Sequence, residues 1–240
     1  ADGTDIVLVT DHLADPGGEN YDDDEPAWSP DSRSIVFVSD VDPDRPPDGH
    51  DPKKDPMVRV VRRIRYRADT IGWRGDAFRH LFVVDTGTGE VRQLTDDEGE
   101  DSSPAWSPDG TEIAFISDRT GAPQVFVIGA DGTGEQRLTY ESYAPRPTWS
   151  PLPFNEIAYA ARTGPGHDIK VLDLATNEVR QLTYGLGSNE SPSYSPNGRH
   201  VAFTSTRGSG LKQIYTIGRD GNGLSRVTSD GNNEMPSWSR

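Results

Sequence analysis

One short pattern, a proline followed by any residue, an aromatic residue and a serine, occurs five times in this 240-residue chain. The copies read PAWS, PAWS, PTWS, PSYS and PSWS, and they begin at Pro26, Pro104, Pro147, Pro192 and Pro236. Their spacings are 78, 43, 45 and 44 residues, so one unit repeats and its first copy contains an insert. A unit of about 44 residues has the length of one four-stranded β-propeller blade.

Every unit also has the same internal order. After the aromatic pattern comes an apolar run (SIVFVSD, EIAFISD, EIAYAAR or HVAFTST), then a third run, then a short closing segment such as VRQLT. Short β-branched and aromatic runs bounded by Asp-Gly or Asn-Gly favour strands and hairpins. No segment has helical periodicity. We therefore predict an all-β fold, a β-propeller with four full four-stranded blades.

The two chain ends predict a composite fifth blade. The N-terminal ADGTDIVLVTD corresponds to residues Pro108–Asp118, which makes Asp5–Thr10 a second strand, while the final PSWSR has the features of a first strand. We expect the two to pair and close the ring of a single domain, residues 1–240, with the insert at 41–78. A rival alignment with ADGTGEQRLT at Ala130 makes the N-terminal strand a fourth strand. Closure within one chain gives a monomer, and closure between two chains gives a swapped dimer.

The repeated aromatic residues are predicted to belong to the scaffold. A large flat side chain at one fixed position of each blade buries apolar area between neighbouring blades. We assign this role to Trp28, Trp106, Trp149, Tyr194 and Trp238. The Pro108-Asp109-Gly110 segment that follows one of them favours a tight turn into the next strand.

The repeated segments resemble two known families. PAWSPDG, IAFISDR, QVFVIGADG and QRLT are similar to the WD40-like repeat of the TolB propeller, best over Asp101–Arg240. Residues Asp24–Thr95 are similar to the propellers of acylaminoacyl-peptidases and prolyl oligopeptidases. The TolB resemblance implies a non-enzymatic periplasmic module that docks a peptidoglycan-associated lipoprotein. The peptidase resemblance implies a gating propeller without its hydrolase domain. A third alternative is an engineered or permuted scaffold without a native function.

Several function classes are disfavoured by the sequence. The chain has no cysteine, which excludes disulfides and thiolate chemistry, and its net charge of −15 disfavours nucleic acid as a partner. No apolar run is long enough to span a membrane. A G-x-S-x-G nucleophile motif is absent, and the five histidines lack metal-site spacing. We therefore expect no enzyme activity, no catalytic residue and no cofactor.

Acidic residues gather in the loops that lead from a fourth strand into the next first strand. Such loops share one face of a propeller, so their carboxylates are expected to form an acidic rim around the channel mouth, where one-signed charge focuses a field. This rim is predicted to bind a basic protein or peptide, or a cation such as Ca²⁺; the alternative is that it serves solubility alone. The candidate binding residues are Asp22, Asp23, Asp24, Glu25, Asp96, Asp97, Glu98, Glu100 and Asp101.

The insert, Val41–Phe78, belongs to the same face and carries a basic stretch, VRVVRRIRYR. Alternation of arginine with apolar residues predicts a strand or hairpin. Two roles remain open for it: a flap that neutralises the acidic rim, or a docking or gating arm; RNA binding is disfavoured by the surrounding charge. The candidate docking residues are Arg59, Arg62, Arg63, Arg65 and Arg67.

Overall fold

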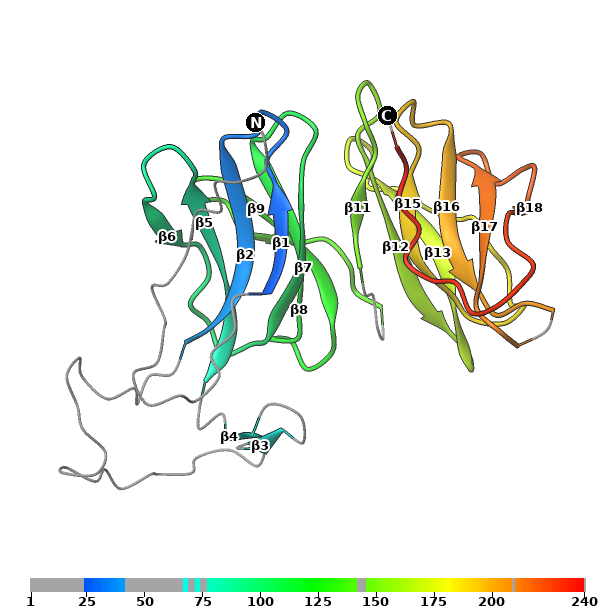
Figure 1. Ribbon diagram of the computed structural model, residues 1–240, viewed down its shortest axis with the longest axis horizontal. Coiled ribbons are helices and arrows are strands. Elements are labelled where there is room, and N and C mark those ends of the chain that lie inside the picture. Colours follow the sequence, from blue (N-terminus) through cyan, green and yellow to red (C-terminus); the bar gives the residue numbers. More distant parts are fainter. Residues whose placement is uncertain are drawn as a thin grey trace.

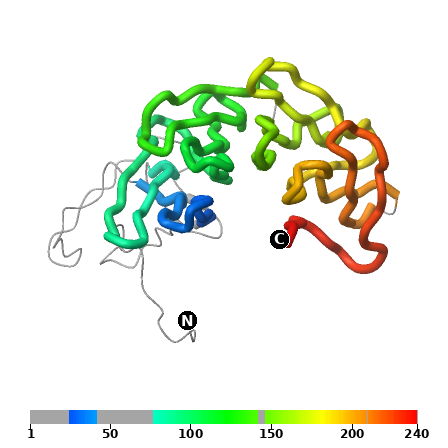
Figure 2. The backbone as a smooth tube through the Cα atoms, turned by 90° about the horizontal axis from the view of Figure 1, so that it is seen from above, coloured from blue at the N-terminus to red at the C-terminus, as the bar shows by residue number. Residues whose placement is uncertain are grey.

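The computed structural model describes residues 24–41, 67–68, 72–73, 77–141, 146–208 and 210–239. In this part of the chain every regular element is a strand, as the sequence predicts, and four antiparallel four-stranded sheets correspond to the four full blades (Figure 1). Figure 2 shows the blades following one another along an arc, with β1 in blue, β15 in orange and the C-terminal segment in red on its inner side.

Within each blade the strands follow chain order from the inner to the outer edge. Blade I contains β1 (Asp24–Trp28), β2 (Ser34–Val41), β5 (Phe78–Asp85) and β6 (Val91–Gln93). Blade II contains β7 (Asp101–Trp106), β8 (Glu112–Ser117), β9 (Gln124–Gly129) and β10 (Gln136–Arg137). Blade III contains β11 (Thr148–Trp149), β12 (Glu156–Thr163), β13 (Gly166–Asp173) and β14 (Val179–Gln181). Blade IV contains β15 (Asn189–Tyr194), β16 (His200–Ser205), β17 (Gln213–Gly218) and β18 (Ser225–Arg226). Between β2 and β5, β3 (Arg67–Ala68) pairs with β4 (Gly72–Trp73).

Most of the hydrophobic core lies between blades, and a smaller cluster around Phe37 and Phe82 belongs to blade I alone. Apolar side chains from β2 and β5 pack against those of β8 and β9, with Phe115 fully buried among them. The same arrangement recurs between blades II and III, around Tyr159, and between blades III and IV, around Phe203. The two middle strands of blades II and III, which have a described blade on each side, are therefore covered on both faces, which explains their apolar sequences.

In blades II and III the aromatic residue of the repeated pattern links neighbouring innermost strands, as predicted, whereas Trp28 and Trp238, expected to be buried between blades, are exposed. The indole Nε1 of Trp106 donates to the carbonyl of Ala27 in blade I at 3.0 Å, and that of Trp149 donates to Ala105 in blade II at 2.9 Å. Each of these two indoles thus has a partner for its only polar group. The repeat places the same bond at the inner edge of successive blades.

The threonine of the closing segment ties the outer half of each blade together. Its Oγ1 accepts the backbone N–H of a third-strand residue at 2.9 Å in all four blades. In three blades the same hydroxyl donates to a polar side chain at the start of that strand, at 2.8 Å. These threonines are Thr95, Thr139, Thr183 and Thr228. The LT and VT endings therefore belong to the scaffold.

The predicted C-terminal strand is not observed as a strand. After β18 the described residues form no ladder, although Trp238 donates to the carbonyl of Ser193 at 3.0 Å, as its counterparts do. Met235 also donates its N–H to Thr204 Oγ1 at 3.1 Å. The segment thus lies where an innermost strand would lie, but a strand needs a paired neighbour. The neighbour that the sequence suggests, Asp5–Thr10, lies outside the described residues.

A buried carboxylate joins blades III and IV. The side chain of Glu156 is 1% exposed, and its Oε1 accepts from Arg180 and from Arg219 Nη2, each at 2.5 Å. Its Oε2 accepts from Arg219 Nε at 2.7 Å and from the Tyr194 hydroxyl at 3.2 Å. Burial and this carboxylate raise the pKa of Tyr194. Tyr194 stands where the other repeats have tryptophan, and its polar group bonds to Glu156 instead of to a backbone carbonyl.

We predict that Glu156→Gln lowers the free energy of unfolding by about 2 kcal/mol, because it removes the charge that balances two arginines that are themselves partly exposed. Glu112→Gln is the matched control, since Glu112 begins the equivalent strand of blade II and is exposed. Its effect should stay within about 0.5 kcal/mol. Urea unfolding measures both; equal effects of the two substitutions would contradict the role of Glu156.

Candidate functional site

The residue before the proline of each repeat has a left-handed backbone conformation. The φ angles are 51° at Glu25 and 53° at Ser103, Arg146, Ser191 and Met235. Such angles are uncommon outside glycine, and here they recur at one position of the repeat. In blades I, II and IV the pairing of the first strand with the second shifts at this position. A bulge of this kind redirects a side chain, and here it turns the residue toward the inner side of the arc.

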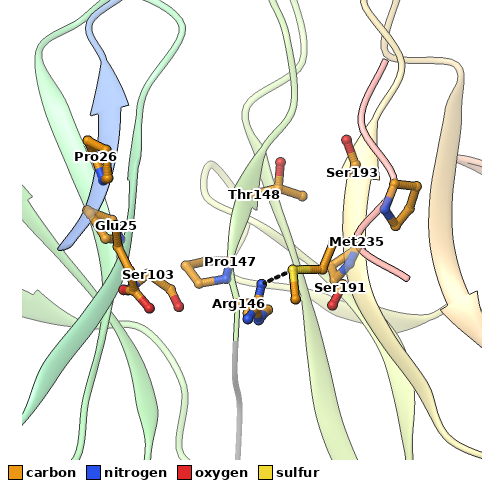
Figure 3. Close-up of a pocket in the computed structure, with 12 residues that line it drawn as sticks. Glu25, Pro26, Ser103, Arg146, Pro147, Thr148, Ser191, Ser193 and Met235 are labelled. Atoms are coloured by element: carbon orange, nitrogen blue, oxygen red, sulfur yellow. Dashed lines mark hydrogen bonds between the residues drawn. The ribbon is translucent and has the colours of Figure 1, made fainter. Parts of the chain in front are cut away.

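These five residues and the prolines that follow them line one cavity of about 480 Å³, together with Thr148 and Ser193 (Figure 3). We call it the central cavity. Figure 3 shows Glu25 and Ser103 on one side, Met235 and Ser191 on the other, and Arg146 between them. The cavity is therefore built by the innermost strands and by the segment that contains Met235.

The five redirected side chains share a backbone conformation but differ in chemistry. They comprise one carboxylate, two hydroxyls, one guanidinium and one thioether, whereas the proline and serine of the pattern recur in every repeat. The carboxylate of Glu25 accepts the backbone N–H of Ser103, and Arg146 Nη1 donates to the sulfur of Met235 at 3.2 Å. The scaffold thus fixes where these side chains lie and leaves their identity free.

The predicted acidic rim is divided between structural and exposed carboxylates. Asp101 is fully buried: its Oδ2 accepts from Thr95 Oγ1 at 2.5 Å, and its Oδ1 accepts from Arg119 at 3.2 Å. Arg119 also pairs with Asp97 at 2.6 Å. Burial, with the neighbouring Asp101 charge, raises the pKa of Asp97. Asp101 therefore joins blades I and II and is not accessible to a partner.

The remaining rim candidates lie in different surroundings. Glu100 is half-buried and accepts the backbone N–H of Arg79 at 3.2 Å, while Asp96 and Glu98 are exposed. Glu25 faces the central cavity rather than the rim. Only the backbone of Asp24 is described, at the start of β1. Asp22 and Asp23 lie outside the described residues.

The candidate docking arm cannot be placed in the same way. Arg59, Arg62, Arg63 and Arg65 lie outside the described residues, and of Arg67 only the backbone is described, in β3.

Within the described ranges, no three His, Asp or Glu side chains come close enough to share a metal ion, and no helix is long and apolar enough to span a membrane. The Ca²⁺ site at the channel mouth stays a prediction.

A serine, a histidine and a glutamate meet at the blade III–IV boundary. Ser188 Oγ donates to Glu190 Oε1 at 2.6 Å, and His167 Nδ1 lies 3.0 Å from that hydroxyl and 3.1 Å from that carboxylate. In a serine hydrolase triad the two ring nitrogens serve different partners. Here one nitrogen faces both, and the serine proton points to the glutamate. This cluster does not have triad geometry.

The sequence did contain a signal for the central cavity, which the prediction of an acidic rim did not use. Between repeats, the residue before the proline changes charge and size while the proline and serine of the pattern recur. A position that varies inside a fixed pattern is not needed for the repeated packing. The redirected backbone itself could not be read from the pattern, since glycine is the usual mark of left-handed conformations and none of the five is glycine.

We predict that Asp101→Asn lowers the free energy of unfolding by about 1 kcal/mol and Asp101→Ala by about 3 kcal/mol. Blade IV shows why asparagine should cost less than alanine. Asn189, the counterpart of Asp101 in that blade, is fully buried and accepts from Arg207 at 2.9 Å. An amide therefore fits this site, whereas alanine leaves Thr95 and Arg119 without an acceptor there. Thermal and urea unfolding provide the measurement. Equal loss in both variants would show that the charge, not the acceptor, matters.

Comparison with known proteins agrees with this architecture. The profile of the TolB beta propeller domain matches residues 74–240. The Tol-Pal system protein TolB of Francisella tularensis is 28% identical over 268 residues, covering 89% of this chain and 53% of that protein. An uncharacterized peptidase of Bacillus subtilis, YuxL, is 26% identical over 207 residues, covering 70% of this chain and 30% of that protein.

A solved structure gives the same result at the level of the fold. The crystal structure of TolB from Acinetobacter baumannii superimposes with a TM-score of 0.65 at 25% identity, covering 89% of this chain and 45% of that one. The chain thus spans about half the length of the TolB proteins it matches. The similarity to both TolB and a peptidase agrees with the two resemblances expected from the sequence.

Proposed function

The chain belongs to the TolB beta-propeller family, and we propose that it is a non-enzymatic module that binds a peptide or protein segment in the central cavity and the acidic loops around it. One observation carries the proposal. Five equivalent backbone positions aim side chains of four different chemistries at one cavity, while the proline that follows each of them is constant. Chemical variety on a fixed frame suits recognition, since a few placed polar groups give a cavity its specificity.

The partner is proposed by resemblance. TolB proteins carry the name of the Tol-Pal system, and the sequence resemblance points to an envelope lipoprotein in the periplasm. A peptide or flexible segment suits the cavity, because its lining prolines offer apolar surface and its hydroxyls offer hydrogen bonds. The exposed acids Asp96 and Glu98 would then attract basic residues that flank the inserted segment.

Ring closure is part of the proposal. Trp28 is 61% exposed, whereas its counterparts Trp106 and Trp149 contact the preceding innermost strand. The C-terminal segment supplies a carbonyl at the equivalent place, that of Ser237. We propose that closure brings Trp28 onto this carbonyl and completes a composite fifth blade within one chain.

The function is tested by narrowing the cavity. Ser103→Met combined with Ser191→Met should weaken binding of peptides selected on the unaltered protein from a random display library by about tenfold or more, because two long side chains then fill the ligand's space. Arg146 and Met235 already hold long side chains at the same φ, so the backbone tolerates them. Ser225→Met, on the exposed strand β18, is the control. Undiminished binding to the double variant would place the ligand elsewhere.

The acidic loops are tested separately. Asp96→Asn with Glu98→Gln should slow association of a selected peptide that carries basic residues and reduce the dependence of its association rate on salt, since exposed charge acts mainly on encounter. Stopped-flow measurements at low and physiological salt would record this. The dissociation rate should change little. An association rate and salt dependence equal to those of the unaltered protein would show that Asp96 and Glu98 take no part in attracting the ligand.

A second candidate function follows from the match to a peptidase. In that case the chain gates access to a hydrolase domain, and the cavity is a passage rather than a binding site. The two candidates differ in affinity, because a passage should retain no selected peptide while a binding site should retain a defined set. The same display selection therefore separates them.

A further inference from the structure

Arg146 is the charged group with the fewest partners in the central cavity. Its guanidinium has five N–H donors, yet its one hydrogen bond among the described residues goes to the sulfur of Met235 at 3.2 Å. A thioether is a weak acceptor. Figure 3 shows the side chain lying inside the cavity toward Met235 and Ser191. Most of its donors are thus directed at space that a ligand can occupy.

Some arginines of the described chain pair with carboxylates. Arg119 pairs with Asp97, Asp101 and Glu135, and Arg219 pairs with Glu156. In a protein of net charge −15, acids are abundant, yet within the described residues no carboxylate lies within ion-pair distance of Arg146. Other arginines without a carboxylate partner, such as Arg137 and Arg226, donate to backbone carbonyl oxygens, whereas Arg146 lines the cavity and its one hydrogen bond among the described residues goes to a sulfur.

The nearest acids are already engaged. Glu234, which precedes Met235, pairs with Lys212, and the hydrogen bond from Lys212 lowers the pKa of the Glu234 carboxyl; the charge of Arg146 contributes less. Glu25, across the cavity, accepts the backbone N–H of Ser103. Neither carboxylate forms an ion pair with Arg146 in the structure.

The surroundings of Arg146 suit one class of ligand group. Ser191 offers a hydroxyl, and the lining prolines and the Met235 side chain offer apolar contact. The Arg146 side chain is exposed to the cavity solvent, and a planar guanidinium binds carboxylates with two parallel hydrogen bonds. We propose that Arg146 anchors a carboxylate of the bound peptide inside the central cavity. This inference rests on the proposed peptide-binding function and adds the chemistry that the ligand must carry.

A peptide carboxylate has two sources, the free C-terminus and an acidic side chain. Four short probes separate them: acetyl-Gly-Ala-Gly as the free acid and as the amide, and acetyl-Gly-Glu-Gly-amide and acetyl-Gly-Gln-Gly-amide. Isothermal titration of the whole chain should show that at least one acid binds about tenfold more tightly than its neutral twin. Preference for the first acid identifies a C-terminus, and preference for the second identifies a side chain.

The discrimination should disappear in Arg146→Met, which keeps a long side chain that this backbone position tolerates, as Met235 shows. Arg226→Met is the matched control, because it removes the same charge from an exposed position on β18 and should leave the preference intact. Equal binding of acid and neutral probes, or a preference that survives Arg146→Met, would overturn the inference while peptide binding stands. Failure of every probe to bind, while peptides selected by display bind, would overturn the inference alone; failure of the selected peptides as well would overturn both.

Discussion

The hydrogen bond from an indole N–H to the carbonyl of the preceding innermost strand sets the spacing on which the central cavity depends. It joins Trp106 to Ala27, Trp149 to Ala105 and Trp238 to Ser193, at 2.9 to 3.0 Å each time. A single bond of this kind contributes only about 1 kcal/mol, but it acts at the inner edge of each blade. Because neighbouring innermost strands are held at a fixed separation, the residues beside them reach a common axis.

The boundary between blades III and IV shows what replaces this bond. Tyr194 has no indole, and its hydroxyl contacts Glu156, whose carboxylate also binds two arginines. A buried charge with this many partners keeps the two blades in register where the repeated contact is lacking. The cavity thus retains its geometry although one repeat departs from the pattern.

These contacts explain which features of the structure could be predicted from the sequence and which could not. Strands and turns were predictable because they depend on local composition and on the 44-residue period, and Trp106 and Trp149 took the predicted role because packing recurs with the period. Asp101 was assigned to an exposed rim, since an acidic run gives no sign of which member Arg119 will bury. The ligand-facing role of Arg146 was missed because it depends on a redirected backbone, and no residue type marks that conformation here.

In the proposed function, recognition occurs in the central cavity, and the negative and positive charges of the protein have different roles in it. Carboxylates dominate the protein and its loops, whereas the cavity holds one guanidinium without an acid partner in the described chain. Such an arrangement favours a segment with basic flanks and an inserted carboxylate, since the loops attract the former and Arg146 binds the latter.

Methionine methyl resonances offer the most direct measurement of where the ligand binds. The chain has two methionines, Met57 and Met235, and Met235 lines the cavity. With ¹³C-methyl labelling and a Met235→Leu spectrum for assignment, titration with a bound peptide should shift the Met235 resonance in proportion to saturation. A Met235 resonance that stays unchanged while the peptide binds would contradict recognition in the central cavity.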